Sequence, residues 1–174
     1  MLEYTESKKE AEKLMQIADN KIMGISKISE GYNILIAEEH KKEIYFVSDE
    51  LLKLFRIISK KKHPYSIGFY FGTVDTDFEP SFGALFKFAK ISDYHKVVIS
   101  RKEEMRFLYG RDIRASQIRS FDKELKPGHT VIVCNKSNEA IGLGRVLNPI
   151  KPAKRSEIII KNTMDLGWLL RRKE

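Results

Sequence analysis

The chain has 174 residues, enough for one large domain or two small ones, and 42% of them are apolar. Charged residues make up 32% of the chain, and the formal net charge is +8. No apolar run approaches the roughly 20 residues that a membrane-spanning helix needs, and residues 1–9 lack the apolar core of a signal peptide. We therefore expect a cytoplasmic protein without membrane contact.

The cysteine and histidine content argues against cross-links and metal sites. Cys134 is the only cysteine and lies in an apolar run, which is typical of a small buried side chain. The four histidines show no spacing typical of zinc ligands. The sequence therefore predicts no disulfide, no metal and no cofactor.

The positive charge is confined to the second half of the chain. Residues 1–94 contain 14 basic and 15 acidic residues, whereas residues 95–174 contain 18 and 9, so the net charges are −1 and +9. A one-sided excess of this kind is typical of a polyanion-binding domain. A highly charged surface of the thermophilic type is the alternative, but it accounts better for many charges of both signs.

The sequence of residues 1–94 predicts a sheet of four or five strands with two or three helices. Ser7 and Glu10 fit a capping box that begins a helix over 7–20, and Ser48 is a suitable N-cap for a second helix over 49–59. Strands are expected at 22–28, 32–37, 43–47 and 66–72, and either a helix or a strand running into a helix at 82–89. The expected buried face of the second helix comprises Leu51, Leu54, Phe55 and Ile58.

The second half alternates short strands with turn signals, a pattern typical of a small closed barrel. A short polar connection at 91–94 separates the halves, so we place domains at 1–94 and 95–174. The expected strands are 97–100, 131–134, 140–146 and 157–161. A helix is expected at 102–109, ending at Gly110 and followed by the segment 113–118, and a terminal turn or helix is expected at 165–170.

Several segments of the second half, taken in order, resemble the PUA domain, an RNA-binding module. They are VVI at 97–99, the helix that ends at Gly110, DIRA at 112–115, KPGHTVIV at 126–133 and AIGLG at 140–144. The chain from about residue 45 to residue 170 also resembles the Nip-seven family of ribosome-biogenesis factors, in a form similar to an archaeal homologue. The matching segments are YFVSDELLKL at 45–54, SIG at 66–68, FG at 71–72 and FLYG at 107–110.

The resemblance implies an α+β protein with an N-terminal α/β domain containing an antiparallel sheet, followed by a C-terminal PUA-type pseudo-β-barrel. It implies RNA binding without catalysis, on single-stranded regions of large-subunit ribosomal RNA precursors. Other ribosome-biogenesis or exosome-associated proteins are the expected partners of a monomeric chain. The expected location is cytoplasmic, or nucleolar if the source is eukaryotic.

The candidate RNA-binding residues are cations, because RNA binding needs positive charge to meet phosphates. Lys151, Lys154 and Arg155 form a basic loop stiffened by Pro149 and Pro152. For any single residue an ordinary surface charge is an equally good explanation, so the prediction depends on the cluster. The other candidates are Lys161, Arg171, Arg172 and Lys173 and, as a second choice, Arg111 and Arg114.

Trp168 has two interpretations. Its ring can stack on a base, or it can anchor the C-terminal segment to the barrel together with its apolar neighbours Leu166, Leu169 and Leu170. We favour the anchoring interpretation.

Two other functions remain open. PUA domains often accompany catalytic domains, so the chain can be an RNA-modifying enzyme or its accessory subunit. The first half is small for that role and contains no recognisable catalytic constellation, and the GLG at 142–144 lacks the third glycine of a dinucleotide fingerprint. A translation-factor-like protein acting on mature ribosomes is the third interpretation.

Overall fold

The computed structural model describes residues 3–60 and 64–171. The chain divides into two compact units, Met1–Ala84 and Leu85–Glu174. The division falls within helix α3 (Phe82–Ile91), ten residues before the boundary expected from the sequence.

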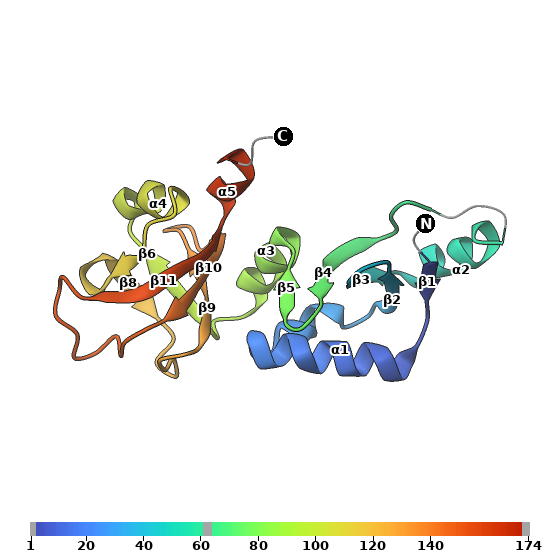
Figure 1. Cartoon of the computed structure of the whole chain (residues 1–174), viewed down its shortest axis with the longest axis horizontal. Helices are drawn as coiled ribbons and strands as arrows, with labels where there is room; N and C mark the ends of the chain where they lie inside the picture. Colours follow the sequence, from blue (N-terminus) through green and yellow to red (C-terminus); the bar gives the residue numbers. More distant parts are fainter. Residues whose placement is uncertain (1–2, 61–63, 172–174) are drawn as a thin grey trace. The chain divides into compact units, whose positions relative to one another are not determined.

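The first unit is built on an antiparallel sheet in the order β1-β2-β3-β4-β5 (Figure 1). Its chain order is a meander, because each strand pairs with its neighbour in sequence. The elements of this unit are β1 (Glu3–Thr5), α1 (Lys8–Lys21), the 3-10 helix η1 (Ile25–Ser29), β2 (Asn33–Glu38), β3 (Lys42–Val47), α2 (Asp49–Ile58), β4 (Phe69–Val74) and β5 (Phe78–Pro80).

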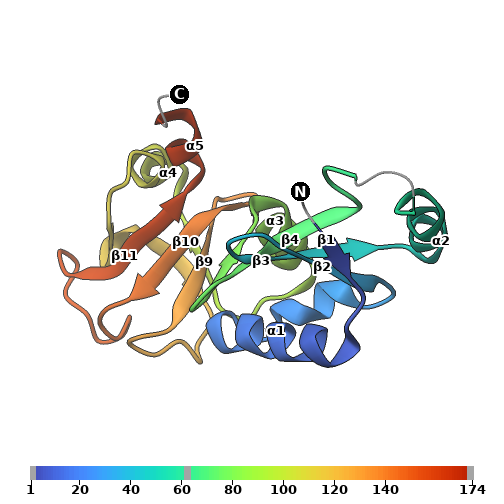
Figure 2. The same cartoon turned by 45° about the vertical axis from the view of Figure 1, so that its right-hand side comes forward.

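Helix α1 runs along one face of this sheet (Figures 1 and 2). The Ser7 hydroxyl accepts the Glu10 N–H, as the capping pattern predicted, and this fixes where the helix begins. The apolar stripe of α1 is buried, which confirms the predicted helix. That stripe comprises Ala11, Leu14, Met15 and Ala18.

Helix α2 packs in a separate apolar cluster of the first unit. Leu52 and Phe55 are buried in a cluster with Leu35, Tyr45 and Val47. The helix lies where it was predicted, and Ser48 caps it by accepting the Leu51 N–H.

The buried face of α2 was predicted wrongly. Leu54 and Ile58 are exposed, although Phe55 is buried as expected. Apolar side chains cover a wide stripe of α2 opposite Asp49, Lys53 and Arg56, and only the part with Leu52 and Phe55 is buried, so the spacing does not determine which part of the stripe faces the core.

The expected strand at 22–28 is also wrong, because the segment turns into η1. Gly24 adopts a left-handed conformation (φ 77°), which interrupts an extended chain. The Asp19 carboxylate then accepts both the Ser26 N–H (2.9 Å) and the Ser26 hydroxyl (2.7 Å). These bonds hold the tight turn in place of strand pairing.

The second unit contains a six-stranded sheet in the order β7-β11-β10-β9-β6-β8. The edge strands β7 and β8 are separated in sequence only by the three-residue η2, so the sheet curls into a nearly closed barrel. The elements are β6 (Lys96–Ile99), α4 (Arg101–Leu108), β7 (Ile113–Arg114), η2 (Ala115–Gln117), β8 (Ile118–Phe121), β9 (Thr130–Cys134), β10 (Ala140–Val146), β11 (Ile158–Asp165) and α5 (Leu166–Arg171).

Inward-facing side chains of the barrel form one apolar cluster. It includes Val97, Phe107, Val133 and Ile160, all of them buried. Cys134 is buried as predicted, and burial raises the pKa of its thiol to about 11. The α+β architecture with an antiparallel first sheet and a barrel-like second sheet is therefore confirmed.

Two glycines of β10 are required by close packing. A Cβ on Gly142 would collide with the Met164 carbonyl oxygen, and one on Gly144 would collide with the side chain of Ile160. Both neighbours belong to β11, so the glycines allow β10 and β11 to approach closely.

His95 directly precedes β6 and lies in an unusual environment. Its φ is 53°, its N–H donates to Asp122 Oδ2 (2.8 Å), and its Nδ1 lies 2.9 Å from the Thr130 carbonyl oxygen. Its ring stacks on that of His129 with centroids 5.1 Å apart. Burial is the main cause that lowers the pKa of His95 from its usual value of 6.5, and the neighbouring His129 acts in the same direction.

The lowered pKa predicts an acid-sensitive unit. Below about pH 6.5 the unfolded chain binds a proton at His95 that the folded chain binds less readily, so the free energy of unfolding should fall as the pH falls. The slope from one proton is at most about 1.4 kcal/mol per pH unit. Denaturant unfolding of the full chain between pH 8 and pH 5 measures it.

The matched variant is His95→Asn, because asparagine tolerates a positive φ and does not titrate. This variant should show a shallower loss of stability with acid than the wild-type chain. Equal slopes for the two proteins would show that another group causes the acid dependence.

Candidate nucleic-acid interface

A groove with a volume of about 650 Å³ lies between β8 and the loop that joins β10 to β11. Its apolar lining includes Ile118, Phe121, Leu125 and Ile150. Four cations also line it, and the described lining residues include no carboxylate. These cations are Arg119, Lys123, Lys151 and Arg155.

Hydrogen bonds between two segments hold the loop beside β8. The Ala115 N–H donates to the Glu157 carbonyl oxygen (2.9 Å), and the Ser116 N–H donates to that of Arg155 (3.2 Å). The Lys154 N–H donates to the Glu157 carboxylate (3.2 Å). The loop is therefore tied to η2, the segment directly before β8.

A β-bulge lies at Arg119. In the pairing of β6 with β8, Val98 faces Ser120 and Ile99 faces Ile118, so Arg119 has no partner of its own. A bulge redirects the side chain of the extra residue, here at the groove. Across the groove, the Lys151 Nζ lies 6.0 Å from the centroid of the Phe121 ring, within range of a cation–π contact.

The electrostatic character of the groove is positive. All four cations are exposed, and none forms an ion pair with a carboxylate in the part of the chain that the structure describes. The nearby Asp122 carboxylate is engaged by the N–H groups of His95 and Glu124. Unpaired cations beside an apolar floor suit a chain with phosphates and exposed bases.

The other predicted residues are distributed over the second unit. Lys154 is exposed in the same loop but does not line the groove. Arg114 donates from Nη1 to the Ser156 carbonyl oxygen (2.9 Å), so it supports the loop.

Two further predicted residues lie away from the groove. Exposed Lys161 on β11 pairs in register with Arg145, and exposed Arg111 follows Gly110. Arg172 and Lys173 lie outside the described residues.

Arg171 is held by the protein itself. Its Nη2 donates to both oxygens of the buried Asp165 (3.0 and 3.1 Å), and its Nη1 donates to the Leu108 carbonyl oxygen. These bonds tie α5 to the end of α4. Trp168 lies on α5, three residues after Asp165, the last residue of β11. It is 48% exposed, so its side chain is not part of the buried core.

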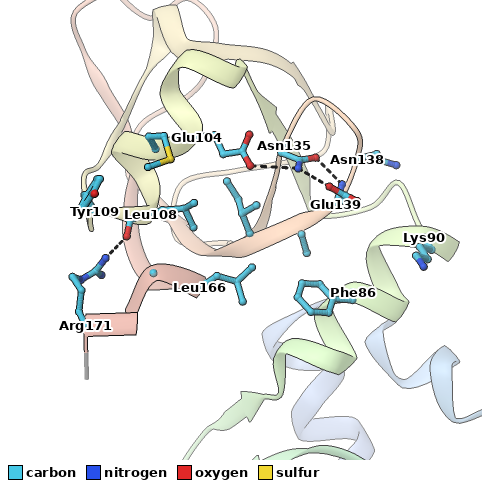
Figure 3. A pocket seen from close by; sticks show the side chains of 14 residues that line it. Phe86, Lys90, Glu104, Leu108, Tyr109, Asn135, Asn138, Glu139, Leu166 and Arg171 are labelled. Carbon is cyan, nitrogen blue, oxygen red and sulfur yellow. Dashed lines mark hydrogen bonds between the residues drawn. The ribbon is translucent and has the colours of Figure 1, made fainter. Parts of the chain in front are cut away.

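A second hollow, of about 610 Å³, lies in the same unit and differs in character (Figure 3). Much of its lining is apolar, including Leu108 on α4 and Leu166 on α5. At its rim the Asn135 side chain lies between two carboxylates, 3.5 Å from Glu104 and 2.8 Å from Glu139 (Figure 3). Carboxylates repel phosphates, so the groove beside β8 is the better candidate for RNA.

Neither a metal cluster nor a membrane helix marks another site in the described residues. Within residues 3–60 and 64–171, no group of histidines, cysteines and carboxylates is placed to hold a metal ion. Over the same ranges, no helix is both long and apolar enough to cross a membrane.

Comparison with known proteins assigns the family. Residues 95–174 match the model of the UPF0113 PUA domain. The chain is 30% identical over 143 residues to a UPF0113 protein of Archaeoglobus fulgidus, in an alignment that covers 80% of this chain and 79% of that protein. The chain belongs to the UPF0113 family. Its second unit is therefore a PUA domain, as the sequence segments indicated.

Solved structures share the whole fold at low sequence identity. A hypothetical protein of Pyrococcus horikoshii OT3 has a TM-score of 0.63 at 16% identity, with 95% of this chain and 94% of that chain covered. A conserved PUA domain protein of Thermoplasma acidophilum has a TM-score of 0.63 at 17% identity, with 98% of both chains covered. A PUA domain protein of Aeropyrum pernix K1, solved as a tartrate complex, has a TM-score of 0.65 at 14% identity, with 96% and 88% covered.

Sequence reasoning missed two residues of the groove, Arg119 and Lys123. They lie on either side of Phe121 in the stretch that forms β8 and its following turn. Basic residues interleaved with an aromatic one are a signal for nucleic-acid binding, and this pattern was available in the sequence.

We expect Arg171 to act mainly on stability. Arg171→Met removes the partner of the buried Asp165 carboxylate and should lower the free energy of unfolding by about 1–3 kcal/mol. Denaturant unfolding of the full chain measures this, with Arg111→Met as the exposed control on the same side of the unit. Equal stability of the two variants would contradict the structural role of Arg171.

Proposed function

We propose that the chain is a non-catalytic RNA-binding adaptor in ribosome biogenesis. In this proposal the groove between β8 and the loop after β10 binds single-stranded segments of large-subunit ribosomal RNA precursors. The observation that carries the proposal is the set of four exposed cations, without described ion-pair partners, around an apolar floor.

The groove offers both kinds of contact that single-stranded RNA uses. Lys and Arg side chains neutralise phosphates, and this contribution does not depend on base sequence. The half-buried Phe121 and the aliphatic floor offer an apolar surface for a base. Arg119 and Arg155 also have planar guanidinium groups, which stack on bases and donate to phosphate oxygens.

The ribosomal role is supported by the resemblance to the Nip-seven family, which the chain shows from about residue 45 to residue 170. The absence of catalysis is proposed on the same resemblance. The division of charge favours separate tasks for the two halves, since residues 1–94 carry a net charge of −1 and residues 95–174 carry +9. We therefore propose that a monomeric cytoplasmic chain holds RNA with its second unit and docks ribosome-biogenesis or exosome-associated proteins with its first.

Removing the four groove cations should weaken RNA binding and flatten its salt dependence. Each lost phosphate contact lowers the slope of log K against log salt by about 0.7 for a single strand, so the loss approaches about 2.8 for four contacts. The measurement is fluorescence anisotropy with a labelled single-stranded RNA at several salt concentrations. The variant combines Arg119→Ala, Lys123→Ala, Lys151→Ala and Arg155→Ala.

The control removes four exposed lysines from the first unit, so it loses as much positive charge as the groove variant. It should bind RNA with nearly the wild-type slope. It combines Lys8→Ala, Lys9→Ala, Lys13→Ala and Lys27→Ala. If the two variants lose equal slope, RNA responds to total charge and the groove is not the site. If neither loses any, RNA binds elsewhere on the chain.

A further inference from the structure

Two stacked histidine rings lie beside the turn at 122–129, which joins β8 to β9. The rings of His95 and His129 are nearly parallel, with an angle of 10° between their planes and 5.1 Å between their centroids. His129 is the last residue of the turn, directly before Thr130 begins β9. Neither ring lines the groove, so binding of RNA there does not by itself explain the pair.

The hydrogen bonds of the pair determine which nitrogen of each ring carries a hydrogen. His95 Nδ1 lies 2.9 Å from the Thr130 carbonyl oxygen, which only accepts, so this nitrogen carries a hydrogen. His129 Nδ1 accepts the Lys126 N–H (3.3 Å), so this nitrogen carries none. The hydrogen of a neutral His129 ring is therefore on Nε2, and a second proton has to be added at Nδ1.

The pair holds the turn at both ends. At its start, the His95 N–H donates to the Asp122 carboxylate (2.8 Å). At its end, the His129 ring accepts the Lys126 N–H. The conformation of the residues between these two points therefore depends on the histidine pair.

The turn also supplies part of the groove wall, because Lys123 and Leu125 line the groove. The end of the turn has a separate attachment to β10. The Gly128 N–H donates to the Val146 carbonyl oxygen (2.8 Å), and the Val146 N–H donates to that of His129 (2.9 Å). Loss of the Lys126 bond therefore loosens the turn and leaves β9 beside β10.

Acid removes the attachment at the end of the turn. Imidazole rings gain a proton between about pH 5 and pH 8. A proton on His129 Nδ1 faces the Lys126 N–H, so two donors meet and their hydrogen bond is lost. Burial, and to a smaller extent the neighbouring His129, lowers the pKa of His95, so the buried ring does not take up the proton in place of its neighbour.

Charged groups of both signs surround the pair. The Asp122 carboxylate favours a charged His95 ring, but it already accepts two N–H groups. The Lys96 ammonium on β6 is directed to the Ala89 carbonyl oxygen and Asp93. The remaining charged side chains of the turn and of β10 are exposed, and these are Lys123, Glu124, Lys126 and Arg145.

The described part of the chain offers no ion pair to a protonated ring. Among residues 3–60 and 64–171, no carboxylate forms an ion pair with His95 or His129. A proton on His129 therefore breaks one bond of the turn without forming an equivalent one.

We propose that His95 and His129 are positioning residues for the groove, and that they make RNA binding sensitive to acid. The pair holds Lys123 and Leu125 in the groove wall while His129 is neutral, and it releases them when His129 is protonated. This regulation rests on the proposed RNA-binding function of the groove.

The direction of the pH effect distinguishes this device from a simple charge effect. Protonated histidines add positive charge, which by itself strengthens the binding of a polyanion. Release of Lys123 acts in the opposite direction, because it removes a cation from the groove. The loss of one such contact weakens affinity by about two- to tenfold.

The test measures the affinity of the full chain for a labelled single-stranded RNA by fluorescence anisotropy at pH 7.5 and pH 5.5, at constant ionic strength. Wild type should bind about two- to tenfold more weakly at pH 5.5. His129→Asn should lose no affinity in acid, because the asparagine oxygen accepts the Lys126 N–H in place of Nδ1 and does not titrate. The control is His40→Asn, which changes an exposed histidine of the first unit and should respond as wild type does.

Hydrogen exchange of the RNA-free chain, followed by nuclear magnetic resonance, tests the turn without RNA. Relative to its intrinsic exchange rate, the Lys126 amide should be protected at pH 7.5 and lose that protection at pH 5.5. In His129→Asn it should stay protected at both pH values. The amides of β9 should stay protected in both proteins, which shows that the unit remains folded.

Three results would overturn the proposal. They are tighter RNA binding by wild type in acid, an equal loss of affinity in His129→Asn, and a Lys126 amide that stays protected at pH 5.5. If RNA binds at neither pH while Lys126 loses protection in acid, the turn is released as proposed and the RNA function of the groove is wrong.

Discussion

The backbone hydrogen bonds between η2 and the segment 154–157 are the constraint on which the C-terminal site depends. They join Ala115 to Glu157 and Ser116 to Arg155. Because η2 links the two edge strands of the sheet, the same bonds that hold the curled sheet also bring the basic loop beside β8. A flat sheet with the same strands would leave Arg119 and Lys151 on separate surfaces. The groove is therefore a consequence of barrel closure and not of any single basic segment.

Much of the fold could be predicted where one pattern dominates. The capping residues Ser7 and Ser48 marked two helix starts correctly, and the apolar runs of β9 and β10 marked two central strands. Prediction from the sequence was wrong where tertiary contacts decide between two local structures. Gly24 and the Asp19 carboxylate convert an apolar run into η1, and the wide apolar stripe of α2 does not reveal which part of it is buried.

The site could be predicted only in part, for related reasons. The charge of the loop identified Lys151 and Arg155, but the opposite wall depends on a bulge that places Arg119 without a strand partner. The basic C-terminal end looked equally suitable in the sequence. In the structure Arg171 instead neutralises the buried Asp165, because a carboxylate removed from water needs a partner. Local charge density identifies basic segments, whereas the choice among them depends on which carboxylates fold beside them.

Crosslinking in cells is the measurement that bears most closely on the RNA groove, because it reports the RNA and the protein surface together. Ultraviolet crosslinking of the full chain, followed by mass spectrometry of the crosslinked peptides and sequencing of the bound RNA, gives both. We predict crosslinks within residues 115–125 and 149–155, and RNA from large-subunit ribosomal precursors. Crosslinks concentrated instead around Met105 and Tyr109, which line the second hollow, would contradict the assignment of the groove. RNA unrelated to ribosomal precursors would contradict the proposed role in ribosome biogenesis.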